Sequence, residues 1–334
     1  GLFVMSNMQP VIPRFYCDHL NWLIHTGRMA TTDVSISGLS MKAGSSVIEM
    51  FDNTPSNLQI IASAGVSTQC VIKMDTNVSG GTVQDINFIA ILGHNFLDAD
   101  VKFSLEQAAD ARANPTTVTL TDVRNLGTND AGTWTADNNG WTLATFTPID
   151  ANNEEFRIII DVAVGGNYDA EIQIGCILLG RYVDAPHRPD VSLQLSLDQE
   201  NKLIQTDGGM TYSNMKARSA PDWYLAPYEV GTGSTPTIIT RSGRYIHDWS
   251  FSYVADSNLI PDDFQTSTNL LTGTTMFNIL QYTAGSHFPC LIQMDSTSVK
   301  DTGEYLFSRI HQQGAPVSTS PNTWMTRWRI VEEY

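Results

Sequence analysis

Polar and apolar residues alternate along much of the first half of this chain. Residues 33–39 and 99–106 show the pattern most clearly, with an apolar side chain at nearly every second position. A period of two is typical of a β-strand that has one buried and one exposed face. Similar short segments follow one another, and we expect further strands at 46–51, 58–61, 69–74, 116–120, 140–146 and 155–164.

Two segments of the first half are apolar almost throughout. Residues 85–95 have the sequence DINFIAILGHN, and residues 171–181 have the sequence EIQIGCILLGR. Both are shorter than the roughly 20 apolar residues that a membrane-spanning helix needs. A short apolar run that ends at glycine favours a central strand buried on both faces. We therefore expect both segments inside an antiparallel β-sandwich that spans residues 33–184, with no helix between residues 33 and 181.

Prolines separate this predicted sandwich from what precedes and follows it. Residues 1–32 contain Pro10 and Pro13 and are expected to form an irregular lead-in. Residues 185–190 contain two further prolines and predict a linker between two domains.

The second domain, residues 191–334, is also expected to be rich in strands. Its clearest helical spacing lies at 274–282, with Thr274 as a candidate N-cap and Gly285 as the end of the helix. Alternation predicts the strands of this domain at 191–197, 244–253, 287–294, 304–311 and 323–331.

The charge of the chain argues against a nucleic-acid partner. The sequence has 35 acidic and 19 basic residues, which gives a formal net charge of −16. Because binding to DNA depends largely on Lys and Arg neutralising phosphates, we expect no nucleic-acid binding. Only 16% of the residues are charged, and short uncharged polar residues take their place. Such a composition fits a β-rich protein whose outer faces pack against neighbours or meet the extracellular medium.

Cysteine usage and the start of the sequence bear on where the chain is made. The four cysteines form no Cys-x-x-Cys pair, and we expect free, buried thiols rather than a disulfide framework. The first residues lack the basic region and the apolar core of a signal peptide. We therefore expect synthesis in a cytoplasm and no membrane insertion.

The two apolar runs also carry a family resemblance. The first half, with its central INFIAILGHN segment and its late IGCILLG segment, resembles a galactose-binding or discoidin-like jelly roll. Together with the HFPC segment at 287–290 and a terminal Glu-Glu, it resembles virion structural proteins of tailed bacteriophages. The resemblance implies a jelly-roll-like sandwich in a tail, tail-tip or baseplate component. It also implies several copies in the virion, in contact with identical subunits and other virion proteins.

His94 and Asn95 are candidate contacts because they follow the central apolar run. At the end of a sandwich strand, their side chains could bind a sugar hydroxyl. The alternative, which we favour, is that both side chains satisfy backbone groups in the turn after the strand.

Trp324 and Trp328 are candidate glycan or interface contacts in the second domain. Tryptophan faces stack on sugar rings, but alternation along a strand favours burial in a core or a subunit interface. Asp256, Asp262 and Asp263 could act as acid/base carboxylates or calcium ligands, yet their spacing fits no known calcium loop and favours a solvated loop. No zinc, phosphate-binding or nucleophile motif occurs, so we expect no catalytic residue, cofactor or metal.

The sequence supports two main hypotheses about function, which belong to different classes of protein. The first is a non-enzymatic structural component of a phage virion that assembles through β-domain interfaces. The second is a glycan-binding module that recognises a host cell surface. A secreted glycoside hydrolase with an accessory domain is a third and weaker option.

Overall fold

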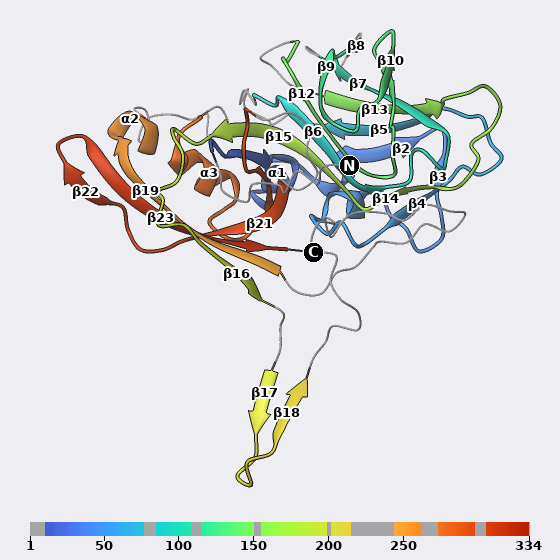
Figure 1. Ribbon diagram of the computed structural model, residues 1–334. Helices are drawn as coiled ribbons and strands as arrows, with labels where there is room; N and C mark the ends of the chain where they lie inside the picture. Colours follow the sequence, from blue (N-terminus) through green and yellow to red (C-terminus); the bar gives the residue numbers. More distant parts are fainter. Residues whose placement is uncertain are drawn as a thin grey trace, which may run out of the picture.

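A computed structural model describes residues 11–76, 85–108, 115–149, 155–198, 202–214, 244–261, 273–297 and 305–333. In these ranges the chain is mainly β, and its sheets are antiparallel (Figure 1). The predicted class, a β-sandwich together with a β-rich part that contains one short helix, is confirmed. No helix within the described ranges is both long and apolar enough to span a membrane.

The largest sheet has 11 strands in the described residues and runs through both halves of the chain. Its strands, in spatial order, are β16 (Gln194–Asp198), β19 (Arg244–Ala255), β23 (Thr323–Glu332), β21 (Tyr305–Gln312), β20 (Cys290–Gln293), β1 (Arg14–Asp18), β15 (Cys176–Asp184), β6 (Phe88–His94), β12 (Gly140–Phe146) and β9 (Leu120–Arg124), and β22 (Val317–Ser320) also pairs with β23.

A second sheet covers one face of the first-half strands. It contains β10 (Thr128–Asp130), β11 (Thr133–Thr135), β7 (Val101–Ala108), β13 (Glu155–Val162), β5 (Cys70–Asp75) and β2 (Val34–Ser37), with β8 (Thr116–Thr117) beside β7. Two smaller sheets consist of β14 (Ile172–Ile174), β4 (Gln59–Ala62) and β3 (Ser40–Met41), and of the hairpin β17 (Lys202–Gln205) and β18 (Thr211–Asn214).

The core of the sandwich lies between the two large sheets. Phe146 on β12 and Phe156 on β13 meet across it, with ring centroids 6.1 Å apart. Every residue of β6 is buried: Ile89 and Ile91 belong to this core, and Phe88 belongs to a second apolar cluster. The strand is therefore buried on both faces, which explains why its sequence is continuously apolar and confirms the expected central strand.

The lead-in and the linker differ from the prediction. Residues 1–32 are not irregular where the structure describes them, because Arg14–Asp18 forms β1 and Leu20–His25 forms helix α1. β1 pairs with β15 of the first half and with β20 of the second half. The residues of the predicted linker, 185–190, are also held in place, since the Asp190 N–H donates to the carbonyl oxygen of Ser250 at 2.8 Å. One sheet therefore joins the two predicted domains.

The second half follows the predicted alternation. Trp249 on β19 and Trp328 on β23 lie opposite each other and are buried. Helix α3 (Met276–Tyr282) is confirmed, although its N-cap is Thr275 rather than Thr274. Gly285, with φ +73°, ends the helix by donating its N–H to the carbonyl oxygen of Leu280 at 2.7 Å. A short helix α2 (Asp256–Leu259) follows β19.

One predicted strand is a 3₁₀-helix instead. The strand expected at 46–51 is replaced by η2 (Ile48–Phe51), and a second 3₁₀-helix, η1, covers Thr31–Asp33. Met50 and Phe51 are both buried, although they are neighbours in the sequence. A strand would turn them to opposite faces, whereas a helical turn lets both reach the core.

The four cysteines are free and buried, as expected.

We predict that Phe15→Ala destabilises both halves together. The Phe15 ring packs edge-on against Trp328, with centroids 5.6 Å apart, and β1 pairs with both halves. Loss of this buried ring should lower the free energy of unfolding by about 3–5 kcal/mol. Urea unfolding followed by tryptophan fluorescence and by circular dichroism should show one shared, shifted transition. The exposed Val317→Ala serves as a control, and two separate transitions, of which only one shifts, would contradict the prediction.

Candidate functional site

His94 lies at the end of β6 and is fully buried. The Phe96 N–H donates to His94 Nδ1 at 3.3 Å, so the ring proton is on Nε2, which lies 2.8 Å from Thr142 Oγ1. The imidazole also stacks on the Phe96 ring, with centroids 4.3 Å apart. Burial, together with the charge of Arg124, lowers the pKa of His94 to about 3. The ring is therefore neutral and acts as an internal hydrogen-bonding group.

Asn95 ties the end of β6 to the start of β14. Its Nδ2 donates to the carbonyl oxygen of Glu171 at 2.8 Å, and its Oδ1 accepts the Gln173 N–H at 2.8 Å. The side chain is buried, like that of His94. Neither side chain can reach a glycan at the surface in this structure, and each satisfies a backbone group instead.

The two candidate tryptophans of β23 lie in different surroundings. Trp328 is buried between Phe15 and Phe251, at centroid distances of 5.6 and 5.7 Å, and has no exposed face for a sugar. Trp324 is half-buried, and its Nε1 donates to Asp256 Oδ1 at 2.8 Å. The carboxylate of Asp256 thus accepts a hydrogen bond from the Trp324 indole. Asp262 and Asp263 lie outside the described residues.

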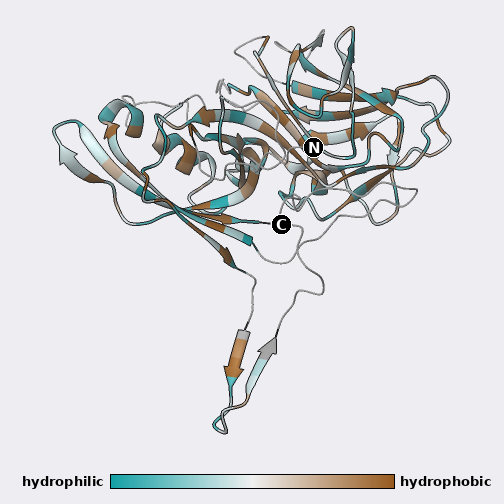
Figure 2. Cartoon of the chain, in the orientation of Figure 1, coloured by the Kyte–Doolittle hydropathy of each residue, from teal (hydrophilic) through white to brown (hydrophobic). Residues whose placement is uncertain are grey.

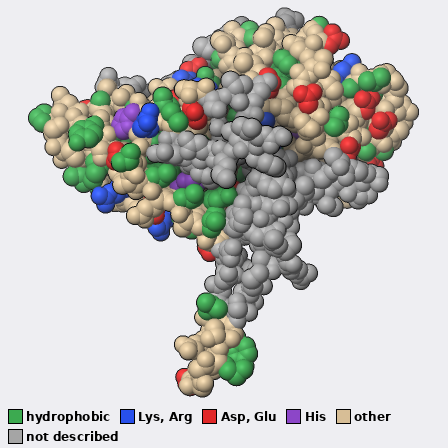
Figure 3. All heavy atoms as spheres, in the orientation of Figure 1, with side chains coloured by type: hydrophobic (Ala, Val, Ile, Leu, Met, Phe, Trp, Pro, Cys, Tyr) green, Lys and Arg blue, Asp and Glu red, His purple; other side chains and the backbone are tan. Residues whose placement is uncertain are grey.

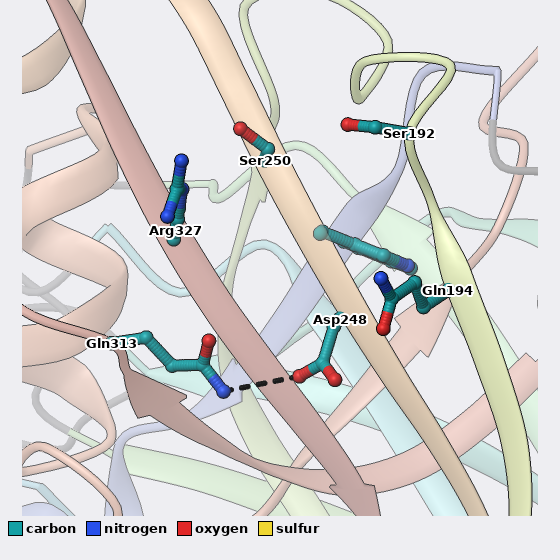
Figure 4. Close-up of a pocket in the computed structure, with 7 residues that line it drawn as sticks. Ser192, Gln194, Asp248, Ser250, Gln313 and Arg327 are labelled. Carbon is teal, nitrogen blue, oxygen red and sulfur yellow. Dashed lines mark hydrogen bonds between the residues drawn. The ribbon is translucent and has the colours of Figure 1, made fainter.

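The sequence did not predict a polar pocket of about 340 Å³ over β19 and β23 (Figure 4). Alternation along β19 turns Trp249 into the core and leaves Asp248 and Ser250 on the opposite face. The pocket is lined by Ser192, Gln194, Asp248, Trp249, Ser250, Gln313 and Arg327. The polar positions of β19 and β23 were visible in the sequence, but nothing in it showed that the strands would be neighbours.

Asp190 positions the segment that forms one wall of the pocket. Its Oδ2 accepts the Ser252 hydroxyl at 2.7 Å, and its Oδ1 accepts the Ser252 N–H at 3.2 Å. This carboxylate therefore fixes the chain against β19 shortly before Ser192. From there the chain enters β16, where Gln194 lies opposite Asp248.

The charges of the pocket do not cancel. Arg329 donates to both carboxylate oxygens of Asp248 at 2.8 Å, and Gln313 Nε2 donates to Asp248 Oδ1 at 3.1 Å. The hydrogen bonds from Arg329 hold the pKa of Asp248 below its usual value. Arg327 has no ion-pair or side-chain hydrogen-bond partner within the described ranges, although it lines the same pocket. Among the described residues, the uncompensated charge of the pocket is therefore positive.

The hairpin β17–β18, here called the arm, is a second exposed feature. It projects away from both large sheets (Figure 1). Its turn is closed by the Thr206 N–H, which donates to the carbonyl oxygen of Met210 at 2.9 Å. In Figure 2, β17 is drawn mostly in the colour of hydrophobic residues. In Figure 3, hydrophobic side chains lie at the surface of the arm. The exposed apolar residues of the arm are Leu203, Ile204, Met210 and Tyr212.

The described residues contain no group of three or more His, Cys, Asp or Glu side chains that could hold a metal ion. No family model matches the sequence, and no curated protein matches it.

Solved carbohydrate-binding modules have a distant structural similarity to part of the chain. One is a chitosan-binding module from a chitosanase/glucanase of Paenibacillus sp. IK-5, at 17% identity and a TM-score of 0.31, over 44% of this chain and 93% of that chain. Another is CBM32-1 from a family 31 glycoside hydrolase of Clostridium perfringens, at 12% identity and a TM-score of 0.31, over 46% and 98%. A third, a CBM32 module produced by Clostridium perfringens, is in complex with GlcNAc-α-1,4-galactose, at 17% identity and a TM-score of 0.27, over 44% and 90%.

These TM-scores are too low to support a conclusion about this chain. The comparisons give no support to a virion role either. Any function assigned to the chain therefore rests on its own residues and geometry.

We predict that His94 makes stability depend on pH. Its folded pKa of about 3 lies below the value of about 6.5 expected in the unfolded chain. As the pH falls below about 6.5, the unfolded chain takes up a proton that the folded chain does not. The His94 contribution to the free energy of unfolding should thus fall by about 1.4 kcal/mol per pH unit.

His94→Gln isolates this effect, because the contributions of other titrating groups cancel in the difference. The stability difference between the variant and the parent chain should change by about 1.4 kcal/mol per unit between about pH 6 and about pH 4. Urea unfolding at several pH values measures it. Parallel pH profiles of the two proteins would contradict the prediction.

Proposed function

We propose that the chain is a non-enzymatic structural component that assembles in several copies, with the arm as a main contact. The observation that carries the proposal is the exposure of apolar side chains on a hairpin that stands away from the protein body. Leu203 is 69% exposed and Ile204 is 51% exposed. Neighbouring residues of a strand point to opposite faces, so both faces of the arm carry apolar side chains.

An arm of this kind needs a partner for its stability. An isolated two-stranded hairpin is marginally stable in water, and burial of apolar area on a partner would supply what it lacks. Met210 in the turn and Tyr212 on the second strand extend the apolar surface of the arm, with exposures of 64% and 56%. Burying these side chains in a neighbouring subunit would remove them from water and fix the arm in one orientation.

The edge strand β16 supports a second copy of this chain as the partner. Within the described residues, β16 has a strand partner, β19, on one side only. Leu195 and Leu197 on this strand are exposed as well. The described residues thus include a projecting hairpin and an edge strand with exposed leucines, which together allow repeated contacts between identical subunits.

The place of this assembly is proposed from the sequence resemblance alone. The chain would be a tail, tail-tip or baseplate component of a tailed-phage virion. It would be made in the host cytoplasm and would contact other virion proteins.

We predict that Leu203→Ser combined with Ile204→Ser weakens self-association. Loss of two apolar side chains, each worth about 1.5–3 kcal/mol when buried, should weaken the contact more than tenfold. Size-exclusion chromatography with light scattering over a range of concentrations measures the effect. Val164→Ser, at an exposed valine outside the arm, serves as the matched control. The proposal fails if the parent chain stays monomeric at high concentration, or if the arm variant assembles as the parent does.

A separate measurement tests the proposed location. Mass spectrometry of purified particles should find this chain in several copies per virion. Absence of the chain from the particles would remove the virion assignment and leave the self-association result untouched.

Glycan recognition is a second candidate function, and the polar pocket over β19 and β23 favours it. Hydroxyl, amide, carboxylate and guanidinium groups converge on one hollow, as sugar hydroxyls require. A glycan would bind at this pocket on the outer face of the large sheet. It would not bind at His94 and Asn95, which are buried.

A further inference from the structure

Among the described residues, the polar pocket holds one cation, Arg327, that no acidic side chain neutralises. Asp248 is already bound by Arg329 through two hydrogen bonds of 2.8 Å. Arg327, two residues earlier on the same face of β23, is exposed and has no side-chain partner within the described ranges. The chain has a net charge of −16, so a guanidinium with no acidic partner among the described residues is available to an anionic ligand.

Neutral donors and acceptors surround this cation. Ser250 lies directly opposite Arg327 in the pairing of β19 with β23, and both side chains line the pocket. Ser192 and Gln194 face the same hollow from the neighbouring segment (Figure 4). None of these three side chains has a hydrogen-bond partner within the described ranges, so all three can bind a ligand.

We infer that this pocket binds a saccharide that carries a carboxylate, such as a uronic-acid oligosaccharide. The inference rests on the second candidate function and names its ligand class. Arg327 binds the carboxylate, while Ser192, Gln194 and Ser250 bind ring hydroxyls. The volume of about 340 Å³ lies within the range of small-molecule pockets.

The balance of charge and polarity favours a carboxylate over a phosphate. A planar guanidinium matches a carboxylate through two parallel hydrogen bonds. The second cation, Arg329, is committed to Asp248, so the pocket offers one positive charge to a ligand. One positive charge among neutral hydroxyl and amide groups suits a monoanion with many hydroxyls. A phosphate dianion would need more cations.

Titration calorimetry of the intact chain with oligogalacturonides tests the inference, with the methyl-esterified oligosaccharides as matched neutral ligands. The acid form should bind, and the ester should bind at least about tenfold more weakly, because esterification removes the charge that Arg327 recognises. Arg327→Gln should weaken binding of the acid to the level of the ester. Arg188→Gln removes an exposed guanidinium that does not line the pocket and should leave binding unchanged.

Salt at about 0.15 M screens the long-range repulsion between an acidic chain and an acidic ligand. Thermal unfolding of Arg327→Gln should match that of the parent chain, because this side chain is exposed and has no ion pair or side-chain hydrogen bond within the described ranges. Equal binding of acid and ester, or acid binding that Arg327→Gln leaves unchanged, would overturn the inference and leave glycan recognition standing. No binding of either oligosaccharide would overturn the inference, and no binding across an array of neutral and acidic glycans would also remove the second candidate function.

Discussion

The pairing of β1 on both of its edges is the constraint on which the rest of the structure depends. Arg14–Asp18 aligns with β15 over its whole length and with β20 over its first three residues. Its two faces are also covered, since Phe15 belongs to one apolar cluster and Tyr16 to the other. β1 is therefore paired on both edges and covered on both faces. It connects the strands of the first-half sandwich to those of the second half, so one sheet contains strands from both halves.

This continuity explains where binding surfaces can form. The core faces of β19 and β23 are occupied by Trp249 and Trp328, which pack edge-on against the Phe15 ring. The opposite faces of the same strands carry the polar side chains that line the pocket. Burial on one side thus fixes the spacing of polar groups on the other. The apolar side chains of the arm, in contrast, are exposed to solvent.

Local patterns predicted the elements whose environment is regular. The run at 85–95 became a strand buried on both faces, and helical spacing located α3 with an error of one residue at its N-cap. Prediction was wrong at 46–51, where two adjacent buried residues, Met50 and Phe51, require a helical turn. It was also wrong for β1, because the short sequence between Pro13 and His19 gives no sign of the two strands that flank it.

By itself the sequence determined the mainly β class, the alternation of buried and exposed positions, and the free buried cysteines, because these follow from side-chain chemistry and from a period of two. Tertiary structure alone decided that the halves share one sheet, that Asn95 bonds to the backbone of Glu171 and Gln173, and that Arg327 has no side-chain partner within the described ranges. Each of these depends on strands that are distant in the sequence becoming neighbours through hydrogen bonds, and periodicity within one strand carries no record of its partner.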